Sequence, residues 1–145
     1  MKIKGLIGFS AIFLALTCSV LPARAQRAVS REEYIITYAP LAIEQQKLYG
    51  IPASIKMAQG ILESGYGNSE LSRMSNNHFG IKCKSWWTGE SVTFDDDEKG
   101  ECFRKYKTVE ESYRDHSEFL KAGKHYAFLF DLKPDDYEGW AHGLK

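Results

Sequence analysis

The sequence contains few cysteines, has equal numbers of basic and acidic residues, and shows no internal repeat. Its 145 residues include three cysteines, four prolines, and 19 basic against 19 acidic residues. No two cysteines or histidines have the close spacing of zinc ligands, so we expect no metal site. No surplus of positive charge is available to neutralise phosphates, which argues against a nucleic-acid partner. Without a repeat or a low-complexity segment, a single domain is the expectation.

Residues 1–25 have the layout of a secretory signal peptide. Lys2 and Lys4 precede an apolar run over residues 5–21, and Ala23 and Ala25 supply small residues at the cleavage positions. The run is shorter than the roughly 20 residues of a membrane-spanning helix. A membrane anchor and a lipid-modified Cys18 are the alternatives that we rank below cleavage. We therefore expect a periplasmic or secreted protein with no stable membrane span.

The remainder of the chain begins with three stretches of helical spacing. "SREE" from Ser30 is a capping box, and we expect its helix to kink or restart at Pro40 and to end at Gly50. A second helix starts at Pro52 and stops at the glycines of "SGYG". A short third helix follows from Ser69 to the Asn76–Asn77 turn. In the second helix the spacing predicts one buried stripe, at Ile55, Ala58, Ile61 and Leu62.

Residues 78–106 change to short, roughly alternating segments. "FGIKC", "ESVTF" and "CFRKY" predict two or three strands, with a hairpin turn over residues 96–100. Cys83 and Cys102 flank this small sheet, and an oxidising compartment favours a disulfide over two free thiols or a zinc site. After residue 30 the class is α+β, mainly helical with a small antiparallel β-hairpin.

Two further helices complete the predicted domain. Thr108 with Glu111, and Asp135 with Glu138, predict capping boxes at their starts. Their buried faces are expected at Val109, Tyr113, His116 and Leu120, and at Tyr137, Trp140, Ala141 and Leu144. The four histidines lack the spacing of a catalytic triad or of metal ligands, and we expect structural or exposed roles for His78, His116, His125 and His142.

The residue with the clearest chemical potential is Glu63, in "GILESGYGNS". It ends an apolar helix, where the helix dipole of roughly −0.5 charge disfavours a carboxylate. Partial burial by Leu62 and Tyr66 would also favour the protonated form. Both effects suit a general acid. Most glutamates in a last turn are merely exposed, and what favours catalysis here is the neighbouring glycines, asparagines and Phe79.

The ordered segments resemble a known family of enzymes. "IPASIKMAQGILESGYGNSELSRMSNNHFGIKC", then "CFRKY" and "SYRDHSEFL", are similar to the glucosaminidase domains of glycoside hydrolase family 73. The resemblance covers residues 32–145, within a domain expected over residues 30–145. It implies a lysozyme-like fold and cleavage of the β-1,4 bond between N-acetylglucosamine and N-acetylmuramic acid in peptidoglycan. It also implies Glu63 as the catalytic acid and requires no cofactor.

A second acid is expected on the hairpin, because glycosidases usually use two carboxylates. The resemblance implies an acid of the hairpin, which offers Asp95, Asp96 and Asp97. We rank them in that order because Asp95 is nearest the strand residue Phe94, and Glu90 is a further candidate. A solvated acidic turn is the alternative for each of them. A calcium loop is not expected, since "DDDEKG" lacks alternating ligands and the distal glutamate.

The substrate contacts follow partly from the resemblance and partly from the strand pattern. The resemblance makes Tyr66, Asn77 and Phe79 candidates for the cleft. Trp86 and Trp87 follow a predicted strand, where adjacent residues face opposite ways. One of these rings would then pack inward and the other would meet a sugar.

One segment of the family pattern is missing. Family members usually carry a tyrosine motif after the final helix, and neither Tyr126 nor Tyr137 matches its position. We therefore expect the chain to be incomplete at its C-terminus. Two alternatives to the hydrolase remain: a lytic transglycosylase, and a non-catalytic cell-wall-binding module. The expected partner is the glycan strand of peptidoglycan, bound by a monomer.

Overall fold

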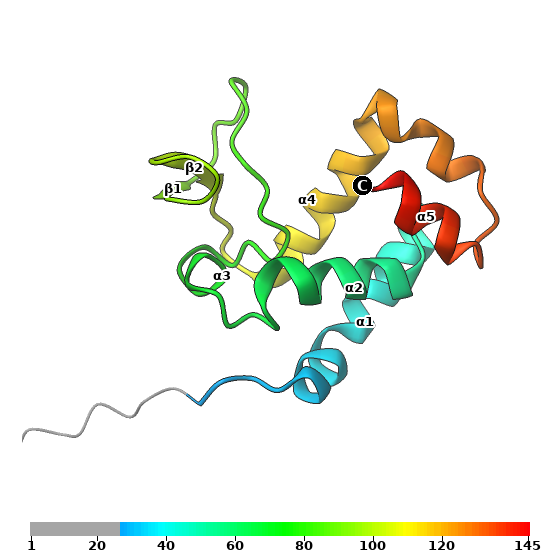
Figure 1. The fold of residues 1–145 in the computed structure, drawn as a ribbon, viewed down its shortest axis with the longest axis horizontal. Helices are drawn as coiled ribbons and strands as arrows, with labels where there is room; N and C mark the ends of the chain where they lie inside the picture. The colour runs from blue at the N-terminus through cyan, green and yellow to red at the C-terminus, as the bar shows by residue number, and fades with distance from the viewer. Residues whose placement is uncertain (1–26) are drawn as a thin grey trace, which may run out of the picture.

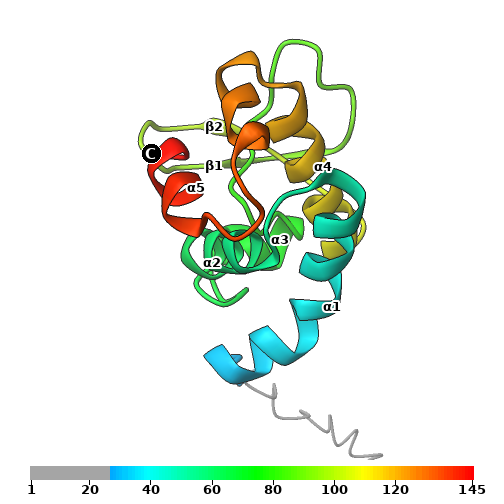
Figure 2. The same ribbon diagram turned by 90° about the vertical axis from the view of Figure 1, so that its right-hand side faces the viewer.

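The computed structural model describes residues 27–145, and the predicted signal peptide lies outside this range. The described part is mainly helical, with one two-stranded antiparallel sheet set to one side (Figures 1 and 2), as the sequence predicts. No helix in residues 27–145 combines the length and the apolar character needed to cross a bilayer. The elements are α1 Arg31–Tyr49, α2 Ala53–Ser64, α3 Glu70–Ser75, β1 Ser91–Phe94, β2 Glu101–Arg104, α4 Val109–Ala122, the 3-10 helix η1 Lys124–Asp131, and α5 Tyr137–Gly143.

Helix α1 starts as predicted but does not stop at its proline. Ser30 accepts a hydrogen bond from the backbone of Glu33, whose carboxylate accepts one from the Ser30 N–H, so the capping box is complete. The helix continues through Pro40 to Gly50, and the predicted restart is wrong. Proline leaves the carbonyl four residues earlier without a partner. That residue is Ile36, which is 77% exposed, so water is available to this carbonyl.

Helix α2 ends as predicted, at Gly65 in the left-handed conformation, but it buries a different face. Of the predicted apolar stripe, Ile55 is buried and Ile61 is half-buried, but Ala58 is exposed and Leu62 is 78% exposed, so the prediction is wrong at these two positions. The buried residues of the helix are Ile55, Lys56, Gly60 and Ser64. Three of these, spaced four residues apart, are small or polar. They let α1 come close to α2 and leave room for the side chains of Tyr113 and His116, which reach α2 from α4.

Gly60 shows how close that approach is. A Cβ at this position would lie 2.7 Å from the Tyr34 hydroxyl and 3.0 Å from the Tyr113 hydroxyl. Neither tyrosine has room to retreat, because both are fully buried and their hydroxyls are 3.1 Å apart. Tyr34 is further held by a 2.9 Å hydrogen bond to Nδ1 of His78.

We therefore expect Gly60→Ala to destabilise the fold. The clash should lower the free energy of unfolding by about 1–3 kcal/mol, outweighing the gain of up to about 1 kcal/mol in helix propensity. Denaturant unfolding measures the difference. Ser54→Ala, at an exposed position of the same helix, is the control and should change stability by less than about 0.5 kcal/mol. An equal or higher stability of Gly60→Ala would contradict the close packing.

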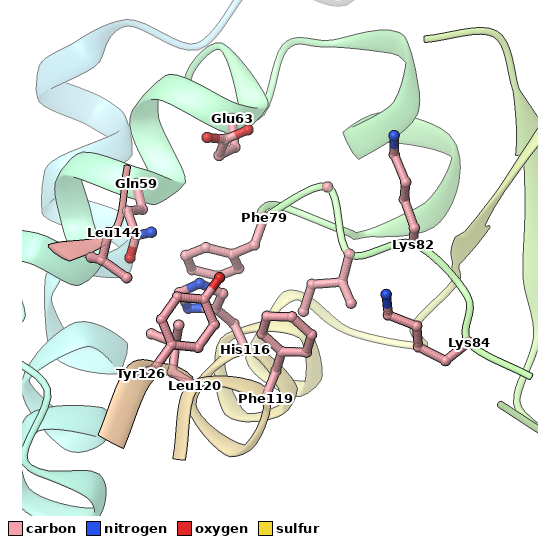
Figure 3. A pocket seen from close by; sticks show the side chains of 12 residues that line it. Gln59, Glu63, Phe79, Lys82, Lys84, His116, Phe119, Leu120, Tyr126 and Leu144 are labelled. Atoms are coloured by element: carbon pink, nitrogen blue, oxygen red, sulfur yellow. The ribbon is translucent and has the colours of Figure 1, made fainter. Parts of the chain in front are cut away.

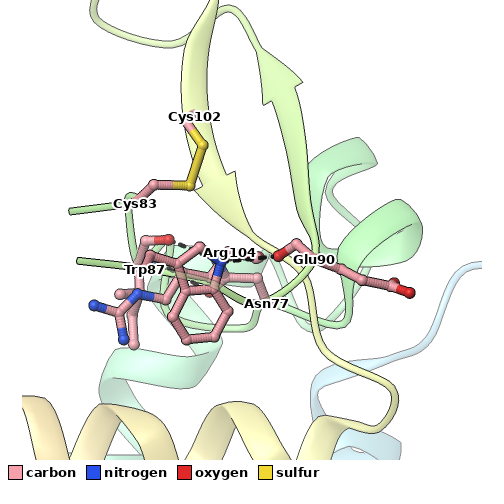
Figure 4. The surroundings of a disulfide bond; sticks show 7 residues. Asn77, Cys83, Trp87, Glu90, Cys102 and Arg104 are labelled. Atoms are coloured by element: carbon pink, nitrogen blue, oxygen red, sulfur yellow. Dashed lines mark hydrogen bonds between the residues drawn. A yellow bond between two sulfur atoms is a disulfide. The ribbon is translucent and has the colours of Figure 1, made fainter. Parts of the chain in front are cut away.

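The hairpin and its disulfide match the prediction. Strands β1 and β2 pair antiparallel, from Ser91 opposite Arg104 to Phe94 opposite Glu101. The third predicted strand contributes only a single bridge, between Lys82 and Phe103. Cys83 and Cys102 form a disulfide with their Cα atoms 5.3 Å apart (Figure 4). It ties the segment before the hairpin to β2.

The last third of the chain differs most from the prediction. Helix α4 buries the predicted Tyr113, His116 and Leu120. Helix α5 is capped by Asp136 rather than Asp135, and only Trp140 of its predicted stripe is buried. Between them lies η1, which the sequence did not predict. It contributes Leu129 to a core cluster with Ile51, Ile55, Leu120 and Trp140.

Candidate active site

Glu63 projects from the last turn of α2 into a pocket of about 310 Å³ (Figure 3). Figure 3 shows Glu63 and Gln59 on the α2 side, with Phe119, Leu120 and Tyr126 opposite and two lysines at one end. Segments far apart in the sequence thus meet at one carboxylate. The full lining is Gln59, Glu63, Phe79, Gly80, Ile81, Lys82, Lys84, His116, Phe119, Leu120, Tyr126 and Leu144.

The immediate surroundings of Glu63 differ from the expectation. Neither Leu62 nor Tyr66 buries it, because Leu62 points outward and Tyr66 does not line the pocket. Glu63 itself is exposed, so the predicted partial burial is wrong. The backbone of Gly80 comes near it instead: a Cβ there would lie 4.0 Å from Oε2 of Glu63, in a conformation with φ of 59°. The loop after α3 therefore lies beside the carboxylate.

The turn after Glu63 has an uncommon backbone. Gly65, Tyr66 and Gly67 all have positive φ, at 55°, 61° and 74°. A non-glycine residue in this region is strained by about 1–3 kcal/mol, and such strain tends to be found at functional sites. Tyr66 therefore contributes through the shape of this turn, which stops α2 directly after Glu63.

Beneath the pocket lies a buried pair that sequence reasoning missed. The Nζ atom of Lys56 is 2.7 Å from Nδ1 of His116, and both side chains are buried. The His116 ring stacks on Phe79, with centroids 4.1 Å apart and planes 7° from parallel. His116 had been expected to be only structural or exposed. A lysine within an apolar helix, seven residues before Glu63, was the available signal.

The buried position changes the acid–base behaviour of this pair. Burial lowers the pKa of Lys56 to about 6. The negative charge of Asp115 acts in the opposite direction, but its effect is smaller. Burial, and then the positive charge of Lys56, hold the pKa of His116 well below its ordinary value. At neutral pH His116 is therefore an uncharged imidazole.

Lys56 predicts a stability that rises with pH. Between its folded pKa of about 6 and its unfolded value of 10.5, the unfolded chain binds the additional proton, so raising the pH favours folding. The slope is at most about 1.4 kcal/mol per pH unit. We expect the free energy of unfolding to increase from pH 7 to pH 9, as measured by denaturant titration.

A substitution at Lys56 separates this effect from other titrations. Lys56→Met should flatten the dependence between pH 7 and pH 9. The lowered pKa values of His78 and His116 act below pH 6.5, and the raised pKa values of the buried tyrosines act above pH 10. An unchanged slope in Lys56→Met would rule out Lys56 as its source.

The hairpin acids occupy distinct positions at its turn. Asp95 accepts a 2.7 Å hydrogen bond from the Gly100 N–H and so closes the turn. Asp97 lies 3.3 Å from Nζ of Lys82, a residue of the pocket wall. The three aspartates are exposed. Asp97 is thus the aspartate with a direct link to the pocket, whereas the sequence ranked Asp95 first.

Lys82 also pairs with a cluster of carboxylates near the turn. Oxygen atoms of Asp96, Asp97 and Glu101 lie within 4.8 Å of one another. The ammonium of Lys82 contacts Glu101 at 2.7 Å as well as Asp97, so a protein cation already neutralises part of this group. Glu90 lies apart from it and pairs with Lys105 at 3.3 Å.

Asn77 has a structural role in the described fold. It is 1% exposed, and its Nδ2 donates to the carbonyls of Ile81 and Arg104 while its Oδ1 accepts from the Ile81 N–H. The expectation that Asn77 contacts a sugar directly does not fit this burial. Asn77 instead fixes the loop that carries Phe79, which does line the pocket.

The two tryptophans lie in a turn rather than on a strand. Their rings flank the guanidinium of Arg104, with its Cζ 4.6 Å from the Trp86 ring and 4.5 Å from the Trp87 ring. Trp87 donates from Nε1 to the Glu90 carbonyl, and Trp86 remains 65% exposed (Figure 4 shows Trp87). The predicted division into one packed and one accessible ring holds, although its basis in strand alternation was wrong. Neither ring lines the pocket of Glu63.

Known structures share this architecture. A peptidoglycan hydrolase from Sphingomonas sp. A1 superposes with a TM-score of 0.68 and 26% identity, covering 79% of this chain and 75% of that chain. The catalytic domain of the autolysin Auto from Listeria monocytogenes gives a TM-score of 0.67 and 29% identity, covering 85% and 77%. The chain thus has the lysozyme-like fold of these hydrolases.

The family follows from the sequence comparison. The glucosaminidase model, described as mannosyl-glycoprotein endo-β-N-acetylglucosaminidase, matches residues 39–145. The chain belongs to this glucosaminidase family of glycoside hydrolases. It is 28% identical over 146 residues to the peptidoglycan hydrolase FlgJ of Vibrio cholerae, covering 89% of this chain and 43% of that protein. It is 43% identical over 83 residues to the exo-glucosaminidase LytG of Bacillus subtilis, covering 52% and 29%. The chain spans less than half the length of these curated relatives.

Proposed function

We propose that this protein is an exported hydrolase that cleaves the β-1,4 bond between N-acetylglucosamine and N-acetylmuramic acid in peptidoglycan, with Glu63 as general acid. The observation that carries the proposal is the pocket at the end of α2, where Glu63 is accessible from solvent and stands over Phe79. Membership of the glucosaminidase family and the names of its relatives support the substrate class.

In this mechanism Glu63 protonates the glycosidic oxygen as the bond breaks. The sugar on the other side of the bond develops positive charge, which a carboxylate stabilises or a positioned water attacks. An aspartate of the hairpin supplies that second function. Asp97 is our preferred candidate over Asp95 and Asp96, because it contacts Lys82 on the pocket wall.

Individual substitution of the three aspartates by asparagine tests the second acid. We expect Asp97→Asn to reduce hydrolysis by about 10²-fold or more, and Asp96→Asn to have little effect. Asp95→Asn keeps an acceptor for the Gly100 N–H and serves as the matched control for the turn. Initial rates of fragment release from purified sacculi measure the effect. If all three substitutions reduce the rate only slightly, the hairpin aspartates take no part in the reaction.

Product analysis distinguishes the proposed reaction from its closest chemical rival. A lytic transglycosylase also uses one acid, and it leaves an anhydro sugar at the new end. Mass spectrometry of digested peptidoglycan should show new reducing N-acetylglucosamine ends. Anhydro ends would favour the transglycosylase, and binding of sacculi without any release would favour a non-catalytic wall-binding module.

Trp86 is a further candidate for contact with the glycan. Its ring is exposed and is supported on one face by Arg104, so it offers a flat apolar surface beyond the pocket. It lines a second cavity, which shares Phe119 with the pocket of Glu63. A glycan strand that extends past Phe119 would reach this ring.

A further inference from the structure

The pocket beside Glu63 contains polar groups without protein partners. Gln59 lies one helical turn before Glu63, and its Oε1 is buried with no hydrogen-bond partner among the described residues. His116 lines the same pocket, and its one hydrogen bond within residues 27–145 occupies Nδ1. Its Nε2 is left for another group. A buried polar atom normally has a partner, so Oε1 of Gln59 indicates a ligand that can donate to it, and Nε2 of His116 offers the same ligand a second contact.

We propose that Gln59 and His116 recognise the acetamido group of the sugar bound beside Glu63. Gln59 accepts a hydrogen bond from the acetamido N–H, and Nε2–H of His116 donates one to its carbonyl oxygen. The methyl group packs against the apolar part of the lining, at Phe79, Leu120 and Leu144. This assignment deepens the proposed function and rests on glycan binding at Glu63.

The contact with Lys56 occupies one nitrogen of His116. The Nζ atom of Lys56 lies 2.7 Å from Nδ1, and we assign His116 the tautomer in which Nδ1 accepts a hydrogen bond from this amine. In a neutral imidazole the proton then resides on Nε2, the nitrogen left for the ligand. Lys56 is fully buried and so does not touch the sugar. It is a positioning residue, and the stacked ring of Phe79 fixes the plane of the imidazole.

The arrangement suits an acetamide better than a hydroxyl or a charged amine at the same carbon. An acetamide supplies one donor, one acceptor and a methyl group, matching Gln59, His116 and the apolar wall. A hydroxyl leaves the apolar wall uncovered and cannot span both polar groups. A protonated amine finds no acceptor on Nε2–H and meets the ammonium groups of Lys82 and Lys84 in the same pocket.

The test compares two neutral sugars that differ at this carbon alone. The β-1,4-linked tetramer of N-acetylglucosamine and cellotetraose are titrated into Glu63→Gln protein, so that neither is hydrolysed during the measurement. Calorimetry or NMR titration gives the two dissociation constants. We expect at least about tenfold tighter binding of the acetylated tetramer, because unsatisfied polar groups penalise the analogue that lacks the matching partner.

Substitutions then assign the preference to the named residues. Gln59→Leu in the same background keeps the size of the side chain and should reduce the preference about 5- to 100-fold. Its thermal midpoint should not fall, because the buried oxygen without a partner is removed. His116→Phe alone leaves Lys56 without its partner, so Lys56→Met/His116→Phe, which removes both polar groups, keeps the test independent of misfolding. Lys56→Met alone should lower the preference while binding of cellotetraose is retained.

Equal binding of the two tetramers by Glu63→Gln protein would overturn the acetamido assignment and leave the proposed function standing. A full preference in both Gln59→Leu and the paired variant would also overturn it. Failure to bind either tetramer would overturn the assignment together with the proposed function.

Discussion

Glu63→Gln is expected to reduce the release of soluble fragments from purified sacculi by about 10²- to 10⁴-fold. Glutamine keeps the shape and hydrogen-bonding capacity of the side chain, but it has no proton to transfer to the glycosidic oxygen. The initial rate of release, measured on the full chain, gives the effect. Glu44→Gln, the same chemical change at an exposed position of α1 outside the pocket, is the matched control and should retain wild-type release.

The same substitution should leave the fold intact. Glu63 is exposed and stands at the negative end of α2, so removing its charge relieves an unfavourable interaction with the helix dipole. We expect an unchanged or slightly higher thermal midpoint. Loss of activity with loss of structure would indicate a structural glutamate. Near wild-type release by Glu63→Gln would show that the proton comes from another group.

Features that depend on short-range chemistry were predictable from the sequence. The Ser30 capping box, the stop at Gly65 and the antiparallel hairpin each depend on residues a few positions apart, and the structure contains all three. The disulfide required only two cysteines beside one small sheet. The family segments identified Glu63 and Phe79, which the pocket brings together.

Features that depend on partners from distant segments were not predictable in the same way. The pattern of α2 favoured burial of Leu62, but α1 and α4 pack on the opposite side through Gly60. Lys56 and His116 are 60 residues apart, and although a lysine within an apolar helix is a signal, it does not identify its partner. The orientation of the two tryptophans was predicted from strand alternation, whereas both rings contact a guanidinium that comes from β2.

That guanidinium also forms an ion pair with helix α4. Arg104 is 1% exposed, and its Nη1 contacts both carboxylate oxygens of Asp115 on α4, at 3.0 and 2.7 Å. The Tyr106 hydroxyl donates to the same carboxylate. Burial, and then the hydrogen bond to Asp115, raise the pKa of Tyr106, so the hydroxyl remains a donor. Arg104 thus joins β2 to α4, and its guanidinium separates the two tryptophan rings.

Arg104→Met is therefore expected to lower the free energy of unfolding by about 3 kcal/mol. Removing one partner of a buried ion pair typically costs about 3–5 kcal/mol, because the other charge is left uncompensated. The lower end applies here for two reasons. The Asp115 side chain is 20% exposed, and Nε and Nη2 of Arg104 already lack partners among the described residues. Denaturant unfolding measures the change, with tryptophan fluorescence reporting on the two rings that lose their spacer.

A second substitution decides whether the charge or the packing is responsible. In Arg104→Met/Asp115→Asn no charge is left unpaired, so part of the lost stability should return, and the double-mutant cycle gives the coupling of the pair. Arg104→Lys keeps the charge but loses the flat guanidinium that lies against the two tryptophan rings, so we expect an intermediate loss. If Arg104→Met and the double variant are equally destabilised, the stacking between Trp86 and Trp87 stabilises the hairpin more than the ion pair does. If Arg104→Met is as stable as the wild type, the hairpin does not depend on this contact with α4.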